Sequence, residues 1–356
     1  MKTISKVAAT LISDFSAETE LSLPAYALEK DHHVLDAIKI VSMMPPSAHF
    51  RLVFCGGTCL SKAYGILERM SEDVDFKVVP TEAGGVLGTA ALRREMGIYV
   101  KSIAAALEAG GFGTDAVLRR SRDDNKYSAL DISYGSVFEK PDSLRPHLLF
   151  ELNYTTLADE TATLPIGALF DRLAFGAYRD PIDIECVSLR EALAEKLVSF
   201  PRRLAMRLSK MAPGASLADQ PGWDQALVRH VYDVNRIVEA HPDFLRHPEA
   251  TCRLVARAIS TDAGEFASQH PAFALAPRAE LVGALVWAKT SKELAGQYDR
   301  FVADMVYAPT DKVATYARST LMFESLLEGI LAHIPDRDLV PAAKPVRKAP
   351  AQDPNR

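Results

Sequence analysis

The residues best suited to chemistry are a glycine pair and two aspartates within the segment 50–79. Gly56 and Gly57 follow a short apolar run, and glycine lets a backbone approach a phosphate closely. Asp73 and Asp75 lie two residues apart in an alternating run, so both carboxylates leave the same face of a strand. Adjacent carboxylates repel each other unless a cation lies between them, and Mg²⁺ favours carboxylate oxygens together with substrate phosphates. The pattern therefore indicates metal-assisted phosphoryl or nucleotidyl transfer.

Each of these stretches also has an ordinary structural explanation. A Gly-Gly-Thr sequence is usually a turn, and an Asp-x-Asp pair is usually the solvated face of a strand. The combination is more specific, because the glycine turn and the carboxylates lie at opposite ends of one strand–helix–strand unit. We expect strands over 50–54 and 74–79, with a helix over 60–70 between them.

The remaining elements divide the chain into a mixed part and a helical part. Apolar spacing predicts helices over 26–41 and 90–109, a hairpin around 123–125 and a strand over 147–154, whereas only helical patterns follow residue 188. We therefore predict an α/β (α+β) fold, in which a mixed sheet with helices precedes an all-helical C-terminal domain. The proposed divisions are 1–185 for the mixed domain, 186–340 for the helical domain and 341–356 for a flexible tail rich in Pro, Ala and basic residues.

Composition excludes several classes of protein. The 356 residues are 48% hydrophobic and 24% charged, which excludes wholesale disorder. No apolar run approaches the ~20 residues of a membrane-spanning helix, and the start of the chain lacks the pattern of a signal peptide. The four cysteines are too few for a disulfide scaffold. The net charge of −5 excludes a globally basic nucleic-acid binder, although a local basic groove is compatible with it. We expect a cytoplasmic protein without membrane partners.

The strand–glycine–helix–Asp-x-Asp pattern resembles the signature of the nucleotidyltransferase superfamily related to DNA polymerase β. Segments 54–65 and 68–76 look like the AbiEii/AbiGii branch, whose members are toxins of toxin–antitoxin and phage-abortive systems. Three further segments match that branch in the same order, at 28–34, 191–197 and 229–234. The sequence departs from the branch at Cys55, where a basic residue is frequent.

The resemblance implies roles for residues around the glycine turn. Asp73 and Asp75 would hold Mg²⁺ (or Mn²⁺) and orient an incoming nucleoside triphosphate (NTP). Gly57 and Thr58, with Gly56 beside them, would contact its phosphates. Two further residues, Arg69 and Ser71, would border the same nucleotide pocket.

A third carboxylate is expected from a neighbouring strand, because sites that resemble polymerase β generally use one as a ligand or base. Glu151 is the first candidate, since it lies in an otherwise apolar strand where an unpaired carboxylate is costly. It could instead face an arginine or solvent at the edge of the sheet. Asp131 is the second candidate, with the polar neighbours Ser128 and Ser133.

The helical part contributes the positive charge. The resemblance implies that Lys196 neutralises the triphosphate and that Asp233 is a further essential polar residue. Asp233 could instead pair with arginines of its own helix, or orient Lys196 or an acceptor hydroxyl. Arg203, Arg207 and Lys210 share a helical face with Lys196, which forms either a cleft for phosphates or a solvated surface. We expect Pro201 to kink or end this helix.

These patterns predict a Mg-dependent nucleotidyltransferase that moves a nucleoside monophosphate from an NTP to an RNA or protein acceptor. The resemblance suggests tRNA as the leading acceptor, a role as the toxin of a toxin–antitoxin or phage-abortive system, and a cognate antitoxin as a candidate partner. One alternative is an NTP-binding regulatory module without transfer activity, although such a module has no chemical reason to retain both Asp73 and Asp75. Another is adenylylation of a polycationic antibiotic, for which no separate acidic cluster is visible.

Overall fold

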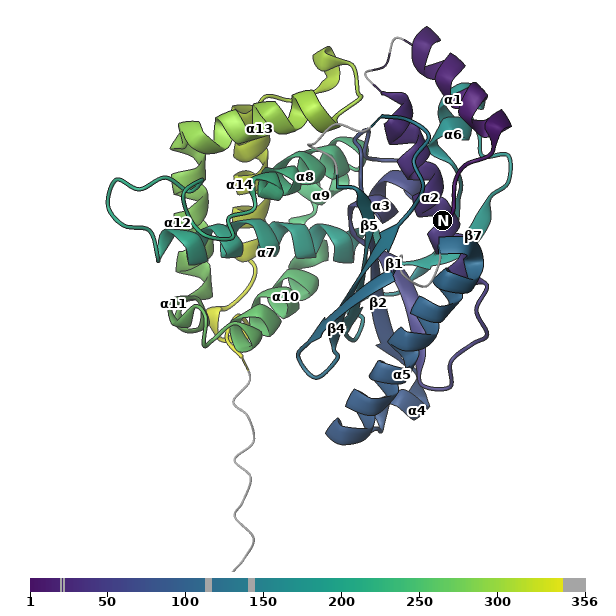
Figure 1. The fold of residues 1–356 in the computed structure, drawn as a ribbon. Helices are drawn as coiled ribbons and strands as arrows, with labels where there is room; N and C mark the ends of the chain where they lie inside the picture. The colour runs from purple at the N-terminus through teal and green to yellow at the C-terminus, as the bar shows by residue number, and fades with distance from the viewer. Residues whose placement is uncertain (20, 22, 113–116, 140–144, 342–356) are drawn as a thin grey trace, which may run out of the picture.

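The computed structural model describes residues 1–19, 21, 23–112, 117–139 and 145–341. Its centre is a seven-stranded mixed sheet in the order β3-β4-β5-β2-β1-β7-β6 (Figure 1). The strands are β1 (Phe50–Cys55), β2 (Asp73–Pro80), β3 (Val117–Arg122), β4 (Tyr127–Ser133), β5 (His147–Tyr154), β6 (Ala162–Ile166) and β7 (Ile182–Cys186). This arrangement confirms the predicted α/β (α+β) class.

Helices lie on both sides of the sheet. The chain that follows the last strand is helical. Those before and within the sheet region are α1 (Lys6–Glu18), α2 (Ala25–Ser42), α3 (Gly56–Lys62), α4 (Glu82–Gly85), α5 (Thr89–Leu107) and α6 (Leu169–Phe175). Those after it are α7 (Leu189–Leu208), α8 (Arg229–Ala240), α9 (Asp243–Arg246), α10 (Cys252–Glu265), α11 (Pro271–Leu275), α12 (Pro277–Thr290), α13 (Lys292–Met305) and α14 (Tyr316–Leu331). In the described part of the chain, no helix is long and apolar enough to cross a membrane.

Alternation along β2 gives this strand one apolar side and one side that carries charged residues at positions 73, 75 and 77. Val74 and Phe76 of β2 are buried in a core that also contains residues of α2 and α5. Asp73 and Asp75 occupy the alternate positions and therefore leave the opposite face. The apolar face thus fixes the register of β2, and the two carboxylates are placed on the side that faces the helical part.

The pairing of β2 with both neighbours brings three site segments together. β1 runs antiparallel to β2, and Cys55 lies opposite Asp75, so the glycine turn that follows β1 begins beside this aspartate. β5 runs parallel to β2 on the other side, and Glu151 lies opposite Asp75. Two candidate carboxylates therefore occupy adjacent positions on neighbouring strands.

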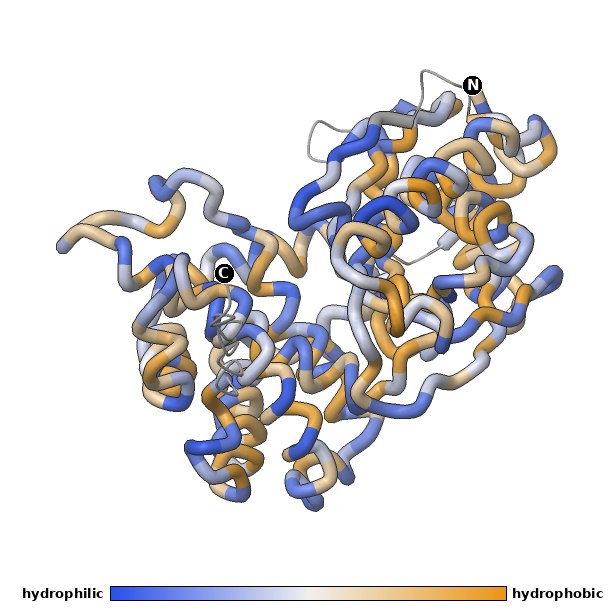
Figure 2. Tube along the Cα trace, turned by 90° about the horizontal axis from the view of Figure 1, so that it is seen from below, coloured by the Kyte–Doolittle hydropathy of each residue, from blue (hydrophilic) through white to orange (hydrophobic). Residues whose placement is uncertain are grey.

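The helical part packs directly on the sheet region. α7 contacts α8, α10 and α12, and a single buried apolar cluster joins Leu197 and Val231 of these helices to Val53 of β1 and Leu60 of α3. The hydropathy view shows apolar residues inside both halves of the molecule (Figure 2). No strand of the sheet follows Cys186 in the described residues, and the proposed division after residue 185 stays a prediction. The proposed tail at 341–356 falls outside the described residues apart from Pro341.

Two local expectations are wrong. The helix expected over 60–70 instead begins at Gly56 and ends at Lys62, and Arg69 forms a bridge with Val306 after α13. This long-range contact holds 66–70 in an extended path and overrides its helical spacing. The helix α7 also continues through Pro201, where a kink or an end was expected. The hairpin around 123–125 is confirmed by the antiparallel pairing of β3 and β4.

Candidate active site

The glycine turn lies directly against the acidic residues of β2. Gly56 adopts φ +75°, a left-handed conformation that favours glycine. A Cβ at this position would lie 2.0 Å from Oδ2 of Asp75, so the missing side chain makes room for the carboxylate. A Cβ at Gly57 would lie 2.5 Å from Nη2 of Arg69 and 3.2 Å from Oγ of Ser71. The structure therefore brings three sequence-predicted site side chains, those of Asp75, Arg69 and Ser71, around the turn at Gly56 and Gly57.

Three carboxylates crowd the polar face of the sheet. Burial, together with the negative charges of Glu151 and Asp73, raises the pKa of Asp75 to about 8. Glu151 accepts a hydrogen bond from the hydroxyl of Tyr127. Because a cation between these groups would relieve their repulsion, the donor set fits a divalent metal ion. In the described part of the chain, no three acidic, histidine or cysteine side chains are already arranged to hold one.

The geometry favours Glu151 over Asp131 as the third carboxylate. Glu151 lies opposite Asp75 and lines the cleft described below. Asp131 accepts a 2.9 Å hydrogen bond from Nη2 of Arg120 and lies 3.4 Å from Nε2 of His147. Asp131 is therefore paired with Arg120 and, unlike Glu151, does not line the cleft.

Thr58 is a buried residue that supports the site through hydrogen bonds. Its side chain is 1% exposed, and its hydroxyl donates to the backbone carbonyl of Asp73. Oγ1 of Thr58 also lies 2.8 Å from Oγ of Ser71. The expected phosphate contact therefore cannot come from this hydroxyl as it is placed here; Thr58 instead ties the start of α3 to the start of β2.

Asp233 of α8 connects the two cations that the sequence placed at the nucleotide pocket. It accepts hydrogen bonds from Nε and Nη2 of Arg69, at 2.7 and 2.8 Å, and from Nζ of Lys196, at 2.7 Å. Asp233 is fully buried, and although burial opposes ionisation, Arg69 and Lys196 hold its pKa well below the ordinary value. Asp233 thus holds both cations in place, and it does not pair with the arginines of its own helix.

The expected basic face of α7 is divided in the structure. Arg203 lines the cleft and forms a 3.1 Å ion pair with Asp224. Arg207 instead donates to the backbone carbonyls of Pro221 and Gly222, at 2.9 and 2.7 Å, and does not line the cleft. Lys210 lies beyond the end of α7 and is exposed. Only the first part of the predicted face, Lys196 and Arg203, therefore lines the cleft.

Sequence reasoning missed two basic residues of the site. Lys77 follows Asp75 by two positions on the same face of β2, and it donates to Glu191, at 2.6 Å, and to Glu195 of α7. The alternation of β2 contained this signal. Nη1 of Arg145 donates to Oδ1 of Asp73 at 2.6 Å. This contact joins distant segments, so no local sequence pattern predicts it.

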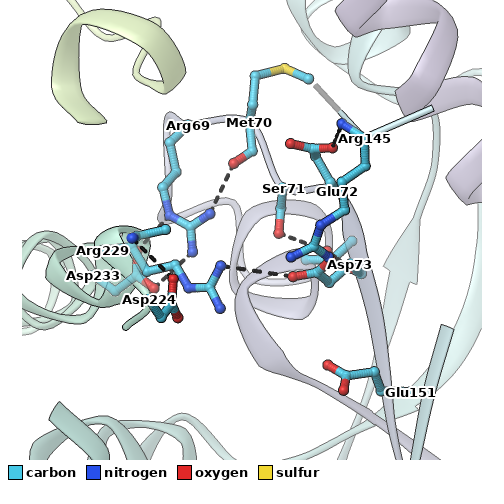
Figure 3. A network of polar contacts seen from close by, with 12 residues as sticks. Arg69, Met70, Ser71, Glu72, Asp73, Arg145, Glu151, Asp224, Arg229 and Asp233 are labelled. Carbon is cyan, nitrogen blue, oxygen red and sulfur yellow. Dashed lines mark hydrogen bonds and ion pairs between the residues drawn. The ribbon is translucent and has the colours of Figure 1, made fainter. Parts of the chain in front are cut away.

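The three carboxylates and several of these cations line one cleft between the sheet and the helical part. Its volume is about 1290 Å³, which exceeds the roughly 300–1,000 Å³ of ordinary small-molecule sites. Asp73, Asp75 and Glu151 lie on the sheet side, whereas Lys196 and Arg229 extend from the helices. Figure 3 shows arginines from different segments converging on Asp73 and Asp233. We call the three carboxylates the acidic wall and Lys196 with Arg229 the basic wall, although residues of the opposite charge, such as Lys77 and Glu195, line the cleft as well.

Comparisons with known proteins agree with this geometry. Residues 45–327 match the family described as nucleotidyl transferase AbiEii toxin, type IV TA system. The chain is also similar to the solved structure of MenT4, a nucleotidyltransferase toxin from Mycobacterium tuberculosis H37Rv. The TM-score is 0.50 at 18% identity, over 93% of this chain and 91% of that one, and this likeness concerns the fold. The comparison with curated proteins returned no match. The chain belongs to the AbiEii family of nucleotidyltransferase toxins of type IV toxin–antitoxin systems.

Proposed function

We propose that this toxin transfers a nucleoside monophosphate from an NTP to an RNA acceptor, with tRNA as the leading candidate. The observation that carries the proposal is the opposition of charges across one cleft. Asp73, Asp75 and Glu151 offer oxygen ligands on the acidic wall, Lys196 offers positive charge on the basic wall, and Arg69 offers it beside the glycine turn. A triphosphate bound to a divalent cation needs both kinds of partner in the same place.

The carboxylates are proposed to hold Mg²⁺ or Mn²⁺. Asp73 and Asp75 would be ligands from one strand, and Glu151 would be the third ligand from the next strand. When bound there, the metal would neutralise the charge on the triphosphate and on the leaving pyrophosphate. The raised pKa of Asp75 supports this assignment, because it comes from burial and from the negative charges of Glu151 and Asp73, and a cation beside the carboxylates would offset that repulsion.

The remaining residues would orient the nucleotide. The missing side chains at Gly56 and Gly57 let Asp75 and Arg69 lie close against this turn, and a phosphate would contact the turn beside these two side chains. Lys196 and Arg69 would stabilise the charge that develops during in-line transfer, because both are held in position by Asp233 before substrate arrives. Catalysis of this kind depends on positioning and on fixed charges more than on covalent chemistry.

Several features of the cleft support an RNA acceptor. Its volume leaves space beyond one nucleotide, and Arg122, Lys126 and Arg202 line it as well. The guanidinium of Arg122 lies 3.9 Å from the centre of the Tyr127 ring, which provides a basic and aromatic surface suited to a single strand. With a net charge of −5, the whole protein would attract RNA only through such a local surface. NTPs and tRNA meet in the cytoplasm, which is the compartment we propose.

Transfer of label from NTP tests the proposal. The purified toxin is incubated with each α-labelled NTP, Mg²⁺ or Mn²⁺, and either total RNA or total protein. We expect label on RNA in the size range of tRNA, and no label with Asp75→Asn. Label on protein alone would replace the RNA acceptor by a protein. Absence of label on both, with correctly folded toxin, would contradict the proposed transfer. Co-expression with the antitoxin that the family implies should relieve toxicity.

The same substitution separates transfer from mere nucleotide binding. Asp75→Asn is expected to abolish toxicity in growing cells while the variant still folds. If toxicity persisted in this variant, the chain would act through binding alone, as a regulatory module.

A further inference from the structure

Arg145 holds the carboxylate of a proposed metal ligand. Its Nη1 donates to Oδ1 of Asp73 at 2.6 Å, and the side chain of Arg145 is 46% exposed at the rim of the cleft. A second guanidinium, from Arg229 of α8, lies 3.8 Å from Oδ2 of the same carboxylate. Figure 3 shows the two arginines meeting Asp73 from different segments. Both oxygens that a metal ion would use therefore already face positive charge.

The backbone of Arg145 is anchored, although its side chain is exposed. Nζ of the buried Lys30 donates to the carbonyl oxygen of Arg145 at 2.9 Å. The backbone N–H of Arg145 donates to Oε2 of Glu72 at 3.2 Å, and Glu72 also pairs with Lys30. Rotation of the side chain alone can thus move the guanidinium, while its point of attachment stays at the cleft.

A divalent cation and Arg145 compete for the same oxygen. When a cation binds Asp73, the guanidinium loses its partner and is repelled by the cation itself. A bound NTP brings phosphate oxygens to the same rim, and guanidinium–phosphate contacts are among the stronger hydrogen-bonded pairs. The displaced side chain therefore has a new acceptor within its reach.

We propose that Arg145 is a nucleotide-binding residue that exchanges partners. It pairs with Asp73 in the metal-free toxin and moves to a phosphate of the NTP when metal occupies Asp73. This inference rests on the proposed function, because it needs a metal at Asp73 and a triphosphate in the cleft. Its signature is a pair of opposite effects, since removing Arg145 frees the metal ligand and also removes a phosphate contact.

The first measurement is the affinity for Mn²⁺ in the absence of nucleotide. Electron paramagnetic resonance detects the free Mn²⁺ that remains in solution. Arg145→Ala is expected to bind Mn²⁺ about two- to fivefold more tightly than the wild type, the size of a half-exposed ion pair. Arg145→Lys retains the charge and should lie close to the wild type. The control is Arg94→Ala, which removes an exposed arginine of α5 that pairs with Glu95 away from the cleft.

The second measurement is steady-state transfer at saturating Mn²⁺. Arg145→Ala is expected to raise KM for NTP about tenfold with a much smaller change in kcat, because a contact made equally in the bound and transition states affects KM alone. Arg145→Lys should recover part of this loss. A merely structural role would lower activity and stability together and would not tighten Mn²⁺ binding.

The outcomes separate this inference from the proposed function. Unchanged or weaker Mn²⁺ binding by Arg145→Ala would overturn the exchange while leaving the metal site in place. Tighter binding with an unchanged KM would overturn the phosphate contact. Failure of the wild type to bind Mn²⁺ or to transfer label would overturn the proposed function and this inference with it. The Arg145→Ala effect should also vanish in an Asp73→Asn background.

Discussion

Arg69 and Asp233 are joined by two hydrogen bonds, at 2.7 and 2.8 Å, across 164 residues of sequence. The pair links the segment before β2 to α8, and Lys196 completes it. Because both arginine and lysine are positioned by one buried carboxylate, Asp233 determines the shape of the basic wall without lining the cleft itself.

Replacing Asp233 should therefore cost both stability and activity. Asp233→Asn leaves two buried cations without their counter-charge, which is expected to lower the free energy of unfolding by about 3 kcal/mol. Chemical denaturation followed by circular dichroism measures this loss. Asp243→Asn is the control, because the side chain of Asp243 is 78% exposed in a surface pair. Equal stability of the two variants would show that Asp233 is not a structural anchor.

The same residue gives a pH dependence with a definite sign. The pKa of Asp233 lies below its ordinary value of 3.8, so its contribution is fully present above about pH 4 and is lost as the pH falls further. The difference in unfolding free energy between wild type and Asp233→Asn should be constant from pH 7 to about pH 5 and should narrow below about pH 4. A difference that grew on acidification would contradict this assignment.

Gly56 is expected to tolerate no side chain. Gly56→Ala places a Cβ 2.0 Å from Oδ2 of Asp75 and adds about 1–2 kcal/mol for the left-handed backbone. Displacement of the carboxylate by about 1 Å should lower kcat on the order of 100-fold. Gly85→Ala is the matched control, because no atom lies within 4 Å of its added Cβ. Normal transfer activity of Gly56→Ala would show that the glycine turn is not needed for the reaction.

The third carboxylate can be identified by comparing two variants. Glu151→Gln removes a charge beside Asp75 and is expected to lower transfer activity or metal affinity about 10–100-fold. Asp131→Asn removes a charge already satisfied by Arg120 and His147, and activity should stay within a few-fold of the wild type. Labelled-NTP transfer over a range of Mn²⁺ concentrations measures both. The opposite ranking would make Asp131 the ligand.

Lys77 is expected to stabilise the contact between sheet and helices. Lys77→Met leaves the buried Glu191 without its 2.6 Å partner, and breaking such a pair is expected to cost about 3 kcal/mol. Glu191→Gln added to Lys77→Met should recover part of this loss, since no buried charge then remains unpaired. Lys101→Met, at an exposed position of α5, is the control in the same denaturation series. Additive effects of the two substitutions would exclude the pairing.

The parts of the site that were predictable are those encoded by local spacing. Asp73 and Asp75 alternate with Val74 and Phe76, so their common face followed from the period of a strand. Lys77 continues that alternation and could have been found in the same way. Family resemblance, rather than spacing, pointed to Lys196 and Asp233.

The parts that were missed depend on contacts between distant segments. The bridge between Arg69 and Val306 replaces a helix by an extended path, and no window around 60–70 contains Val306. Arg145 reaches Asp73 only because β5 pairs with β2. The strands β6 and β7 were not predicted either. They lie at one edge of the sheet, beyond β1, and no sequence pattern used above indicates that edge.

The two walls of the cleft have a consequence for synthesis of the toxin. The three carboxylates are encoded by the end of β5 at Tyr154, whereas Lys196 and Arg229 of the basic wall, and Asp233 that holds Lys196, are translated later. A nascent or truncated chain that ends before α8 contains the three carboxylates but lacks Arg229 and Asp233. Only a chain translated into α8 therefore contains both groups of residues on which the proposed transfer depends.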